Sequence, residues 1–210
     1  MLRILICDDH TITREGLRRI LTDYSEPMQV GEAGSGVECL TMVRRQDWDL
    51  VLLDISLPDQ NGLDVLKRIK RDRPELPVLV LSMYPVDQYA VRVLHAGGAG
   101  YLSKETAPEQ LLAAVRKVAQ GGTFVTPELA EHLAKLLKKD LIKPPHAQLS
   151  DREFEVLRLI ALGKSPTEIA RRLSLSVKTI STYRARVLQK MGMRHNSELT
   201  RYAIANRLVY

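Results

Sequence analysis

The sequence predicts an α/β domain built on a five-stranded parallel sheet, followed by a small all-α domain. Two observations predict this architecture. In the first 120 residues, short apolar runs alternate with segments of helical spacing, which is typical of a parallel sheet covered by helices. From Ser150 onward the apolar spacing is helical throughout, and start signals for helices recur. We therefore expect two units joined by a short connecting segment.

Five apolar runs are the predicted strands: residues 2–7, 29–33, 50–54, 77–81 and 100–102. The third run, Leu50-Val-Leu-Leu-Asp54, is too short for a helix and favours a strand buried on both faces. Pro58 and Gly62 follow it as turn residues. Asp54 is therefore expected where the strand ends, at the edge where open parallel sheets bind their ligands. A simple turn cap is the alternative.

The segments between the strands carry apolar residues at spacings of three and four, as on one face of a helix. These residues are Ile12, Gly16, Leu17, Ile20 and Leu21; Val37, Leu40 and Val43; Leu63, Leu66 and Ile69; Ala90, Val91 and Leu94; and Leu111, Leu112, Val115 and Val118. Thr106, with Glu109 three residues later, predicts the cap of the fifth helix. Gly121-Gly122 then closes the domain.

The connecting segment is expected to contain one amphipathic helix that starts at Thr126-Pro127. Its apolar side would carry Leu129, Leu133, Leu136 and Leu137, with Lys138-Lys139 near its end. The run Lys143-Pro-Pro-His-Ala147 cannot continue the helix and stiffens the connection. The predicted organisation is a first domain over 1–122, a linker over 123–147 and a second domain over 148–210.

The second domain is predicted to hold four helices. Ser150 and Ser165 each begin a capping box, and Ser176 is expected to cap a third helix. Gly163 and Gly192 close helices, and a fourth helix is expected from about Asn196 to Leu208.

The net charge of +6 is unevenly spread. Residues 1–120 carry 15 Lys and Arg against 17 Asp and Glu, whereas residues 148–210 carry 12 against 5, a net charge of +7. This asymmetry favours a domain that binds a polyanion, behind a near-neutral front domain. A solvated basic face without a partner is the alternative.

Both cysteines, Cys7 and Cys39, lie in apolar patterns, so we expect reduced core residues without a metal or disulfide role. The run Leu2–Cys7 is too short for a secretory signal, and no later run approaches a membrane span. These features predict a soluble cytoplasmic protein.

Polar residues follow four of the predicted strands. Asp8 and Asp9 follow the first, Asp54 ends the third, Ser82 follows the fourth and Lys104 follows the fifth. The ends of parallel strands share one edge of the sheet, so these groups can converge. A carboxylate can accept a phosphoryl group, aspartates suit Mg²⁺, and an ammonium and a hydroxyl can bind phosphoryl oxygens.

These strand-end residues, together with the motifs around them, resemble the receiver domain of bacterial two-component response regulators. The matching set comprises Asp8-Asp9, Asp54 in Leu53-Asp-Ile-Ser-Leu-Pro58, Gly62, Ser82 and Gly100-Tyr-Leu-Ser-Lys104. The resemblance implies a flavodoxin-like strand order of 2-1-3-4-5. It also implies that Asp54 is phosphorylated by a partner histidine kinase.

The same resemblance assigns the remaining roles at this edge. Asp9 and Asp54 would bind Mg²⁺ directly, Asp8 through water, and Ser56 through its carbonyl oxygen. Ser82 and Tyr101 match the family's switch pair, in which the hydroxyl moves to the phosphoryl group and the ring turns inward. An ordinary half-buried tyrosine is the alternative for Tyr101.

The segment from Ser165 to Lys190 has the pattern of a helix-turn-helix: a helix over Pro166–Leu173, a turn over Ser174–Ser176 and a longer helix from Val177. On the longer helix Ile180, Tyr183, Val187 and Met191 share the predicted core face. A polar face with short side chains fits the major groove. The candidate DNA contacts are Lys178, Thr179, Ser181, Thr182, Arg184 and Arg186.

This segment resembles the LuxR-type helix-turn-helix domain, and joined to a receiver it resembles the NarL/FixJ family of transcriptional response regulators. The resemblance implies that the fourth helix, around Leu199 and Ala203, pairs two copies on double-stranded DNA. Packing of these residues within one monomer is the alternative.

The leading expectation is a DNA-binding transcription factor, not an enzyme, that is switched by phosphorylation and dimerises on DNA. A phosphatase or phosphotransferase is the second hypothesis. It is disfavoured because Ser56 stands where such enzymes need a general acid beside the nucleophile. A DNA binder that does not depend on phosphorylation is the third.

Overall fold

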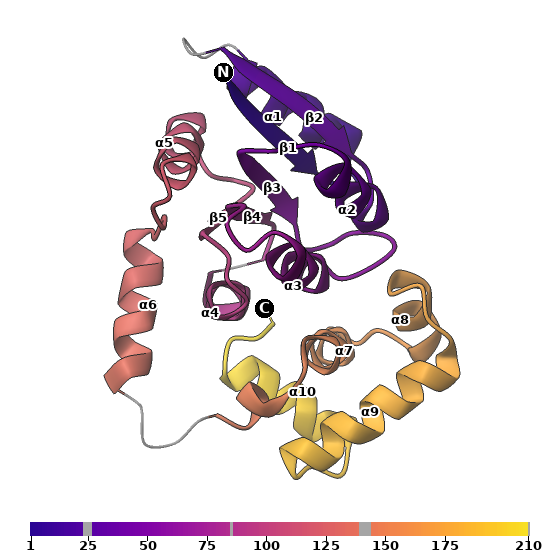
Figure 1. Cartoon of the computed structure of the whole chain (residues 1–210). Helices are drawn as coiled ribbons and strands as arrows, with labels where there is room; N and C mark the ends of the chain where they lie inside the picture. Colours follow the sequence, from indigo (N-terminus) through magenta and orange to yellow (C-terminus); the bar gives the residue numbers. More distant parts are fainter. Residues whose placement is uncertain (23–26, 85, 139–143, 210) are drawn as a thin grey trace. The chain divides into compact units, whose positions relative to one another are not determined.

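In the computed structural model, the first unit is a parallel sheet with helices on both faces, as the sequence predicts (Figure 1). The structure describes residues 1–22, 27–84, 86–138 and 144–209. The chain divides into two compact units, Met1–Leu133 and Ala134–Tyr210. The sheet has five strands in the order β2-β1-β3-β4-β5, with parallel neighbours throughout. This is the flavodoxin-like order implied by the sequence resemblance.

The strands lie within one or two residues of their predicted positions. They are β1 (Leu2–Cys7), β2 (Met28–Ala33), β3 (Leu50–Asp54), β4 (Val78–Ser82) and β5 (Gly100–Ser103). The helices of the first unit are α1 (Thr11–Thr22), α2 (Gly36–Arg45), α3 (Gly62–Asp72), α4 (Val86–His95) and α5 (Pro108–Ala119). Every residue of β3 and β4 is buried, which explains their unbroken apolar sequence.

Helices α1 and α5 cover one face of the sheet through a single apolar cluster. Its members are Ile4, Ile6, Leu21, Leu50, Leu52, Leu79, Leu81, Leu102, Leu111, Ala114, Val115 and Val118. Helices α2, α3 and α4 bury a second apolar set, which includes Leu40, Leu66 and Val93. The candidate site lies at the ends of the strands, between the two layers of helices.

Some predictions about these helices are wrong. Ile12 and Val37 were expected on core faces but are 86% and 61% exposed. They lie in the first turns of α1 and α2, which extend beyond the ends of the strands and therefore do not pack on the sheet. Helix α5 begins at Pro108, and its N-cap is Ala107 rather than Thr106. Proline disfavours helical geometry in the residue before it, so the helix starts at the proline itself.

The predicted linker helix is α6 (Pro127–Lys138). The backbone N–H of Leu129 donates to Thr126 Oγ1 over 3.2 Å, and the Leu129 side chain is fully buried. The side chains of Leu136 and Leu137, and residues Lys139 and Lys143, lie outside the described residues. Within the run that was expected not to continue this helix, Pro145–Gln148 forms one turn of 3₁₀ helix, η1.

The second unit contains the four expected helices: α7 (Asp151–Ala161), α8 (Pro166–Arg172), α9 (Val177–Met191) and α10 (Asn196–Ala205). Ser150 and Ser165 form the predicted capping boxes, and Ser176 Oγ accepts from the N–H of Thr179. Gly163 and Gly192 follow α7 and α9 with φ of +75° and +66°, a backbone conformation that glycine adopts without strain.

Helix α10 ends three residues before the predicted Leu208. Leu208 is nevertheless buried, and its carbonyl oxygen accepts a hydrogen bond from Arg158 Nε over 3.0 Å. Arg207 just before it has a φ of +55°, so the chain turns out of the helix and folds back against α7. The apolar residue marks the core and not the end of the helix.

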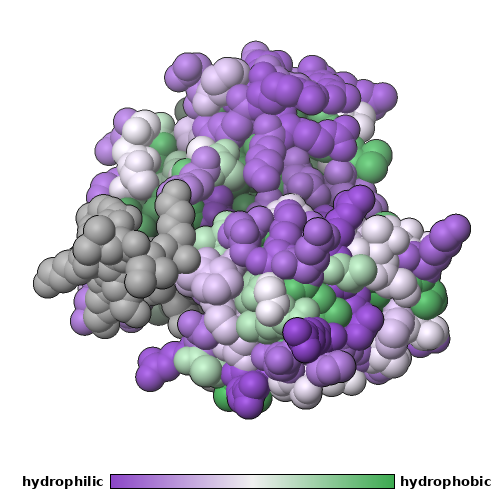
Figure 2. Space-filling model, turned by 90° about the horizontal axis from the view of Figure 1, so that it is seen from below, coloured by the Kyte–Doolittle hydropathy of each residue, from purple (hydrophilic) through white to green (hydrophobic). Residues whose placement is uncertain are grey.

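Hydrophilic side chains cover most of the face shown in Figure 2, with smaller apolar areas between them. Exposed large apolar residues include Ile12, Met83 and Ile204. None of the helices within the described ranges combines the length and apolar character needed to cross a membrane.

Candidate functional site

The ends of β1, β3, β4 and β5 bring the predicted acidic site together. Asp54 is the last residue of β3 and pairs in register with Leu81, one residue before Ser82. Ser82 in turn pairs with Ser103, one residue before Lys104. The backbone N–H of Lys104 donates to the carbonyl oxygen of Ser82 over 2.9 Å. Parallel register therefore places these residues at one edge of the sheet.

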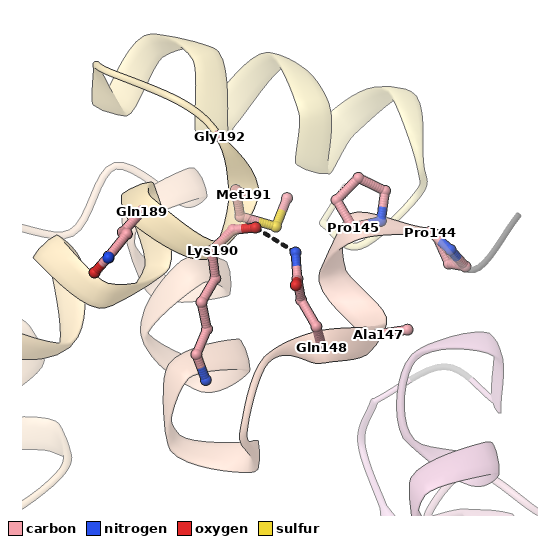
Figure 3. Close-up of a pocket in the computed structure, with 8 residues that line it drawn as sticks. All are labelled: Pro144, Pro145, Ala147, Gln148, Gln189, Lys190, Met191 and Gly192. Atoms are coloured by element: carbon pink, nitrogen blue, oxygen red, sulfur yellow. Dashed lines mark hydrogen bonds between the residues drawn. The ribbon is translucent and has the colours of Figure 1, made fainter.

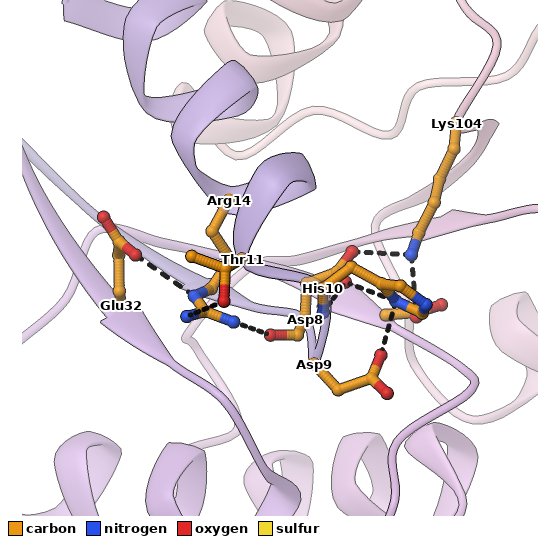
Figure 4. A network of polar contacts seen from close by, with 8 residues as sticks. Asp8, Asp9, His10, Thr11, Arg14, Glu32 and Lys104 are labelled. Atoms are coloured by element: carbon orange, nitrogen blue, oxygen red, sulfur yellow. Dashed lines mark hydrogen bonds and ion pairs between the residues drawn. The ribbon is translucent and has the colours of Figure 1, made fainter.

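Lys104 joins two carboxylates at this edge (Figure 4). Its Nζ lies 2.6 Å from Asp8 Oδ2 and 2.8 Å from Asp54 Oδ2. The three side chains are only 10%, 3% and 3% exposed. An ammonium that pairs with two buried carboxylates offsets their mutual repulsion.

Burial raises the pKa of Asp54 above its ordinary value, and the hydrogen bond from Lys104 opposes this rise only in part. Burial alone would lower the pKa of Lys104, but its hydrogen bonds to Asp54 and Asp8 outweigh burial and raise it. Lys104 therefore stays charged at neutral pH beside a carboxyl group that is held out of water.

Four side chains at this edge could hold a cation. Ligand atoms of Asp8, Asp9, His10 and Asp54 all lie within 4.8 Å of one another. Carboxylate oxygens are the hard ligands that Mg²⁺ prefers, so this donor set fits the predicted cofactor. Sequence reasoning missed His10, whose Nδ1 lies 2.7 Å from Asp9 Oδ1. Its position directly after Asp8-Asp9 was the available signal.

The loop after β3 is folded tightly against Asp54. The backbone N–H of Gly62 donates to the carbonyl oxygen of Ile55 over 2.8 Å, and the side chain of Asn61 caps α3. The backbone N–H of Ser56 hydrogen-bonds to Asp54, which lowers the pKa of that carboxyl against the larger effect of burial. Ser56 therefore lies beside the carboxylate, and its carbonyl as a cation ligand stays a prediction.

Ser82 and Tyr101 meet at the loop after β4. Ser82 is fully buried, and its Oγ accepts a hydrogen bond from the N–H of Tyr84 over 3.1 Å. The Tyr101 hydroxyl donates to the carbonyl oxygen of Tyr84 over 2.6 Å. Tyr101 is 0% exposed, so its ring points inward and it is not a half-buried strand residue. Ser82 and Tyr101, the predicted switch pair, therefore both hydrogen-bond to the backbone of Tyr84.

Helix α9 presents the predicted polar face. Lys178, Ser181, Thr182 and Arg186 are exposed, and Thr179 and Arg184 are partly exposed. On the opposite side Ile180, Val187 and Met191 are buried. Tyr183, predicted to lie in the core, is only partly buried.

Some of the polar side chains of α9 are already engaged. Ser181 Oγ donates to the carbonyl oxygen of Val177 over 3.0 Å, and Thr182 Oγ1 donates to that of Lys178 over 3.1 Å. Arg184 Nε donates to Asn196 Oδ1 over 2.7 Å, which ties α9 to the start of α10. The hydroxyls therefore lie close to the helix, which leaves the surface low enough for a base-pair edge to approach.

The C-terminal end of α9 is anchored to η1 and to the first turn of α7. Gln148 Nε2 donates to the carbonyl oxygen of Lys190 (Figure 3). Lys190 Nζ lies 2.6 Å from Glu153 Oε2, which also accepts from the N–H of Ser150. An open depression of about 730 Å³ lies beside these contacts, lined by Pro144, Pro145, Ala147, Gln148, Gln189, Lys190, Met191 and Gly192. The contacts fix α9 relative to α7.

This anchor predicts a pH effect on the stability of the second unit. Burial alone would raise the pKa of Glu153, but hydrogen bonds from Lys190 and Ser150 outweigh burial and lower it. A lowered folded-state pKa contributes stability above the unfolded value of about 4.3, and this is lost as the pH falls through the folded value. We expect Glu153→Gln to cost about 1 kcal/mol at pH 7 and progressively less below pH 4. Calorimetric unfolding of the full chain across pH measures this difference.

Glu168→Gln is the matched control, because Glu168 occupies the same position in the capping box of α8. It is exposed, and its lysine neighbour Lys164 lies 3.8 Å away. Its substitution should cost less than that of Glu153 at pH 7. Equal costs for the two substitutions would contradict a special role for the Lys190 contact.

The predicted dimerisation residues Leu199 and Ala203 are both 0% exposed. Helix α10 packs these side chains inside the second unit, where α7 is its neighbour. Both side chains therefore pack within one monomer, as in the packing alternative, and the pairing of two copies through the fourth helix stays a prediction. Ile204, which is 60% exposed, lies on the outer side of the same helix.

Comparison with known families gives two matches on this chain. Residues 4–116 match the family described as response regulator receiver domain, and residues 147–203 match the family described as bacterial regulatory proteins, luxR family. Together they span both units and contain every residue of the acidic site and of the polar face of α9.

Two characterised relatives are similar along nearly their whole length. The response regulator UvrY of Escherichia coli strain K12 is 34% identical over 209 residues, which cover 99% of this chain and 96% of UvrY. The response regulator GacA of Pseudomonas aeruginosa is 32% identical over 210 residues, which cover 100% of this chain and 98% of GacA.

A solved structure that is similar over nearly the whole chain is RcsB from Salmonella enterica serovar Typhimurium, bound to promoter rprA in the presence of the phosphomimetic BeF₃⁻. It superimposes with a TM-score of 0.65 at 29% identity and covers 96% of this chain and 98% of RcsB. A second RcsB structure, of an RcsB–DNA complex, gives a TM-score of 0.59 at 31% identity over 96% of each chain.

Proposed function

The chain belongs to the NarL/FixJ family of two-component response regulators, with a receiver domain before a LuxR-type DNA-binding domain, and from this membership we propose that phosphorylation of Asp54 controls its binding to promoter DNA. The observation that carries the proposal is the pairing of Lys104 with both Asp54 and Asp8 on a chain that also bears the polar face of α9.

The phosphoryl group comes from a phosphohistidine of a partner histidine kinase. A carboxylate oxygen of Asp54 attacks the phosphorus, an O–P bond forms, and the N–P bond to the histidine breaks. Lys104 Nζ, which pairs with Asp54 over 2.8 Å, is placed to neutralise a phosphoryl oxygen once the carboxylate has become an acyl phosphate. The histidine nitrogen that leaves the phosphorus takes up a proton from solvent.

The acidic cluster binds Mg²⁺ in this proposal. Asp9 and Asp54 would supply carboxylate oxygens, Asp8 would act through water, and Ser56 would contribute its carbonyl oxygen. When bound, the cation neutralises charge on the transferring group. The chain's own contribution is to hold the ligand atoms of Asp8, Asp9, His10 and Asp54 within 4.8 Å of one another.

The switch runs through the loop after β4. Ser82 Oγ leaves the N–H of Tyr84 to hydrogen-bond a phosphoryl oxygen, so the loop loses this contact with the end of β4. The bond from the Tyr101 hydroxyl to the carbonyl oxygen of Tyr84 then decides where the loop settles. A shift between two arrangements of this loop is the element that phosphorylation biases.

The second unit binds double-stranded promoter DNA with α9 in the major groove, and two copies act together on the site. Lys178 and Arg186 are exposed cations on the outward face, suited to phosphates or base edges. Arg184, already bonded to Asn196, contributes less to the DNA and more to the position of α9. The pairing of two copies is proposed from family membership.

Selection of DNA by the full chain, with and without acetyl phosphate and MgCl₂, tests this function. Phosphodonor treatment should raise the affinity for the selected DNA. Affinity should fall steeply with salt, with a log–log slope of about −0.9 for each phosphate contact. We expect Lys178→Ala to remove about one phosphate contact and so to lower the magnitude of the slope by about 0.9.

Lys67→Ala is the control, because Lys67 is an exposed lysine on α3 of the receiver domain. It should leave the salt slope unchanged. A wild-type affinity that does not vary with salt would count against the basic face as the docking surface.

A further inference from the structure

One guanidinium connects the turn after β1 with the end of β2. Arg14, on α1, donates from Nη1 to the carbonyl oxygen of Asp8 over 2.8 Å, and its Nε lies 3.1 Å from Glu32 Oε2 (Figure 4). Its Nη2 also lies 3.4 Å from Thr11 Oγ1. The Arg14 side chain is only 15% exposed, so it is packed into this position.

The carbonyl that Arg14 binds belongs to the peptide group that joins Asp8 to Asp9. A peptide group is planar, so fixing its oxygen also fixes the direction in which the chain continues to Asp9. The N–H of Asp8 is held as well, because it donates to the carbonyl oxygen of Ala33 over 3.1 Å. The end of β2 therefore holds the Asp8 backbone twice, directly through Ala33 and indirectly through Glu32 and Arg14.

We propose that Arg14, held by Glu32, is a positioning residue for the acidic site, which orients the Asp8–Asp9 peptide so that both carboxylates face one cation. This inference rests on the Mg²⁺ site of the proposed function. Arg14 does not itself supply a ligand, since a guanidinium carries only donors. Its role resembles that of outer partners at metal sites, whose loss weakens metal binding about 10- to 100-fold.

Charge and position predict opposite effects at Arg14. If Arg14 acted only through its charge, its removal would reduce repulsion of a cation and strengthen Mg²⁺ binding. If it positions the peptide, its removal weakens binding although a repulsive charge is lost. Lysine keeps the charge, but a single ammonium cannot reproduce the planar fork that reaches both Glu32 and the Asp8 carbonyl.

The test is calorimetric titration of the full chain with MgCl₂, without phosphodonor. We expect Arg14→Gln and Arg14→Lys each to raise the Mg²⁺ dissociation constant about tenfold. Arg18→Gln is the matched control, because Arg18 also faces Glu32, at 3.4 Å, from the same helix. It is 55% exposed, and its substitution should leave the dissociation constant within twofold of wild type.

Binding by Arg14→Gln that equals or exceeds that of wild type would overturn the proposal, as would wild-type binding by Arg14→Lys. Unchanged fluorescence of the single tryptophan, Trp48, checks that the receiver domain is folded. Should Arg14→Gln fail to fold, Arg14→Lys and Glu32→Gln carry the test, and wild-type affinity in both would overturn it. Phosphorylation of the wild-type chain is measured in a separate experiment. If the wild-type chain incorporates no phosphoryl group, the proposed function is contradicted, while the Mg²⁺ titration still decides the role of Arg14.

Discussion

Asp54→Asn should abolish phosphoryl incorporation and the increase in DNA affinity that follows it. Asparagine has nearly the same shape but cannot form an acyl phosphate, so the loss should be complete. Basal DNA binding should persist, because the second unit is unchanged. The measurement is labelling by a phosphodonor and Mg²⁺, followed by DNA titration of treated and untreated protein.

The Asp54 variant should also be at least as stable as wild type at pH 7. Burial raises the folded-state pKa of Asp54, so the ionised carboxylate opposes folding once the pH exceeds the unfolded value of about 3.9. Replacing it by a neutral amide removes that opposition. Loss of labelling in a folded variant therefore reports chemistry and not unfolding.

Asp59→Asn is the control for this experiment. Asp59 lies in the same loop, but its two carboxylate oxygens accept from the N–H groups of Gly36 and Val37 over 2.9 and 2.8 Å, at the start of α2. An asparagine can still accept from one of these two N–H groups through its amide oxygen. This variant should be labelled like wild type. Equal enhancement of DNA binding in the Asp54 variant after phosphodonor treatment would refute phosphorylation at Asp54 as the switch.

Gly62→Ala should lower the free energy of unfolding of the receiver domain by about 3 kcal/mol. A Cβ at this position would lie 2.6 Å from Ile55 Cα and closer still to the carbonyl oxygen of Asp54. Both atoms are backbone, so relief requires the end of β3 to move, and Asp54 moves with it. The phosphorylation rate should therefore fall together with stability.

Denaturation followed by tryptophan fluorescence measures this effect selectively. Trp48 is the single tryptophan of the chain and is buried in the receiver domain. Gly16→Ala is the matched control, since Gly16 lies within α1 with nothing within 4 Å of a Cβ. That change should stabilise the domain by about 0.5–1 kcal/mol. A Gly62 variant as stable as wild type would show that the loop after β3 can yield.

Local sequence signals predicted most elements because their physical causes are local. Serine caps and glycine stops depend on a few neighbouring residues. Ser150, the N-cap of α7, and Gly192, the C-cap of α9, are both where these signals predict them. The same signals misplaced the start of α5, because the constraint from Pro108 overrides Thr106.

Periodicity in the sequence could not tell an apolar residue that faces a partner from one that extends beyond it. Ile12 and Val37 fit their helical patterns, but both side chains are exposed because they lie beyond the edge of the sheet. Leu199 and Ala203 also fit the pattern of their helix, and only the packing of α10 against α7 shows that both side chains are fully buried within the second unit.

The sequence by itself determined the class of the fold and the strand-end carboxylates Asp8, Asp9 and Asp54, because residues that end parallel strands must share one edge. Its motifs also identified the family, by resemblance. Only the tertiary structure decided which partner each group takes. Lys104 bridges Asp8 and Asp54, Tyr101 points inward onto the loop after β4, and Arg14 holds the Asp8 carbonyl. Lys104 and Asp8 lie 96 residues apart in the sequence, so the geometry of such contacts depends on packing that no local pattern records.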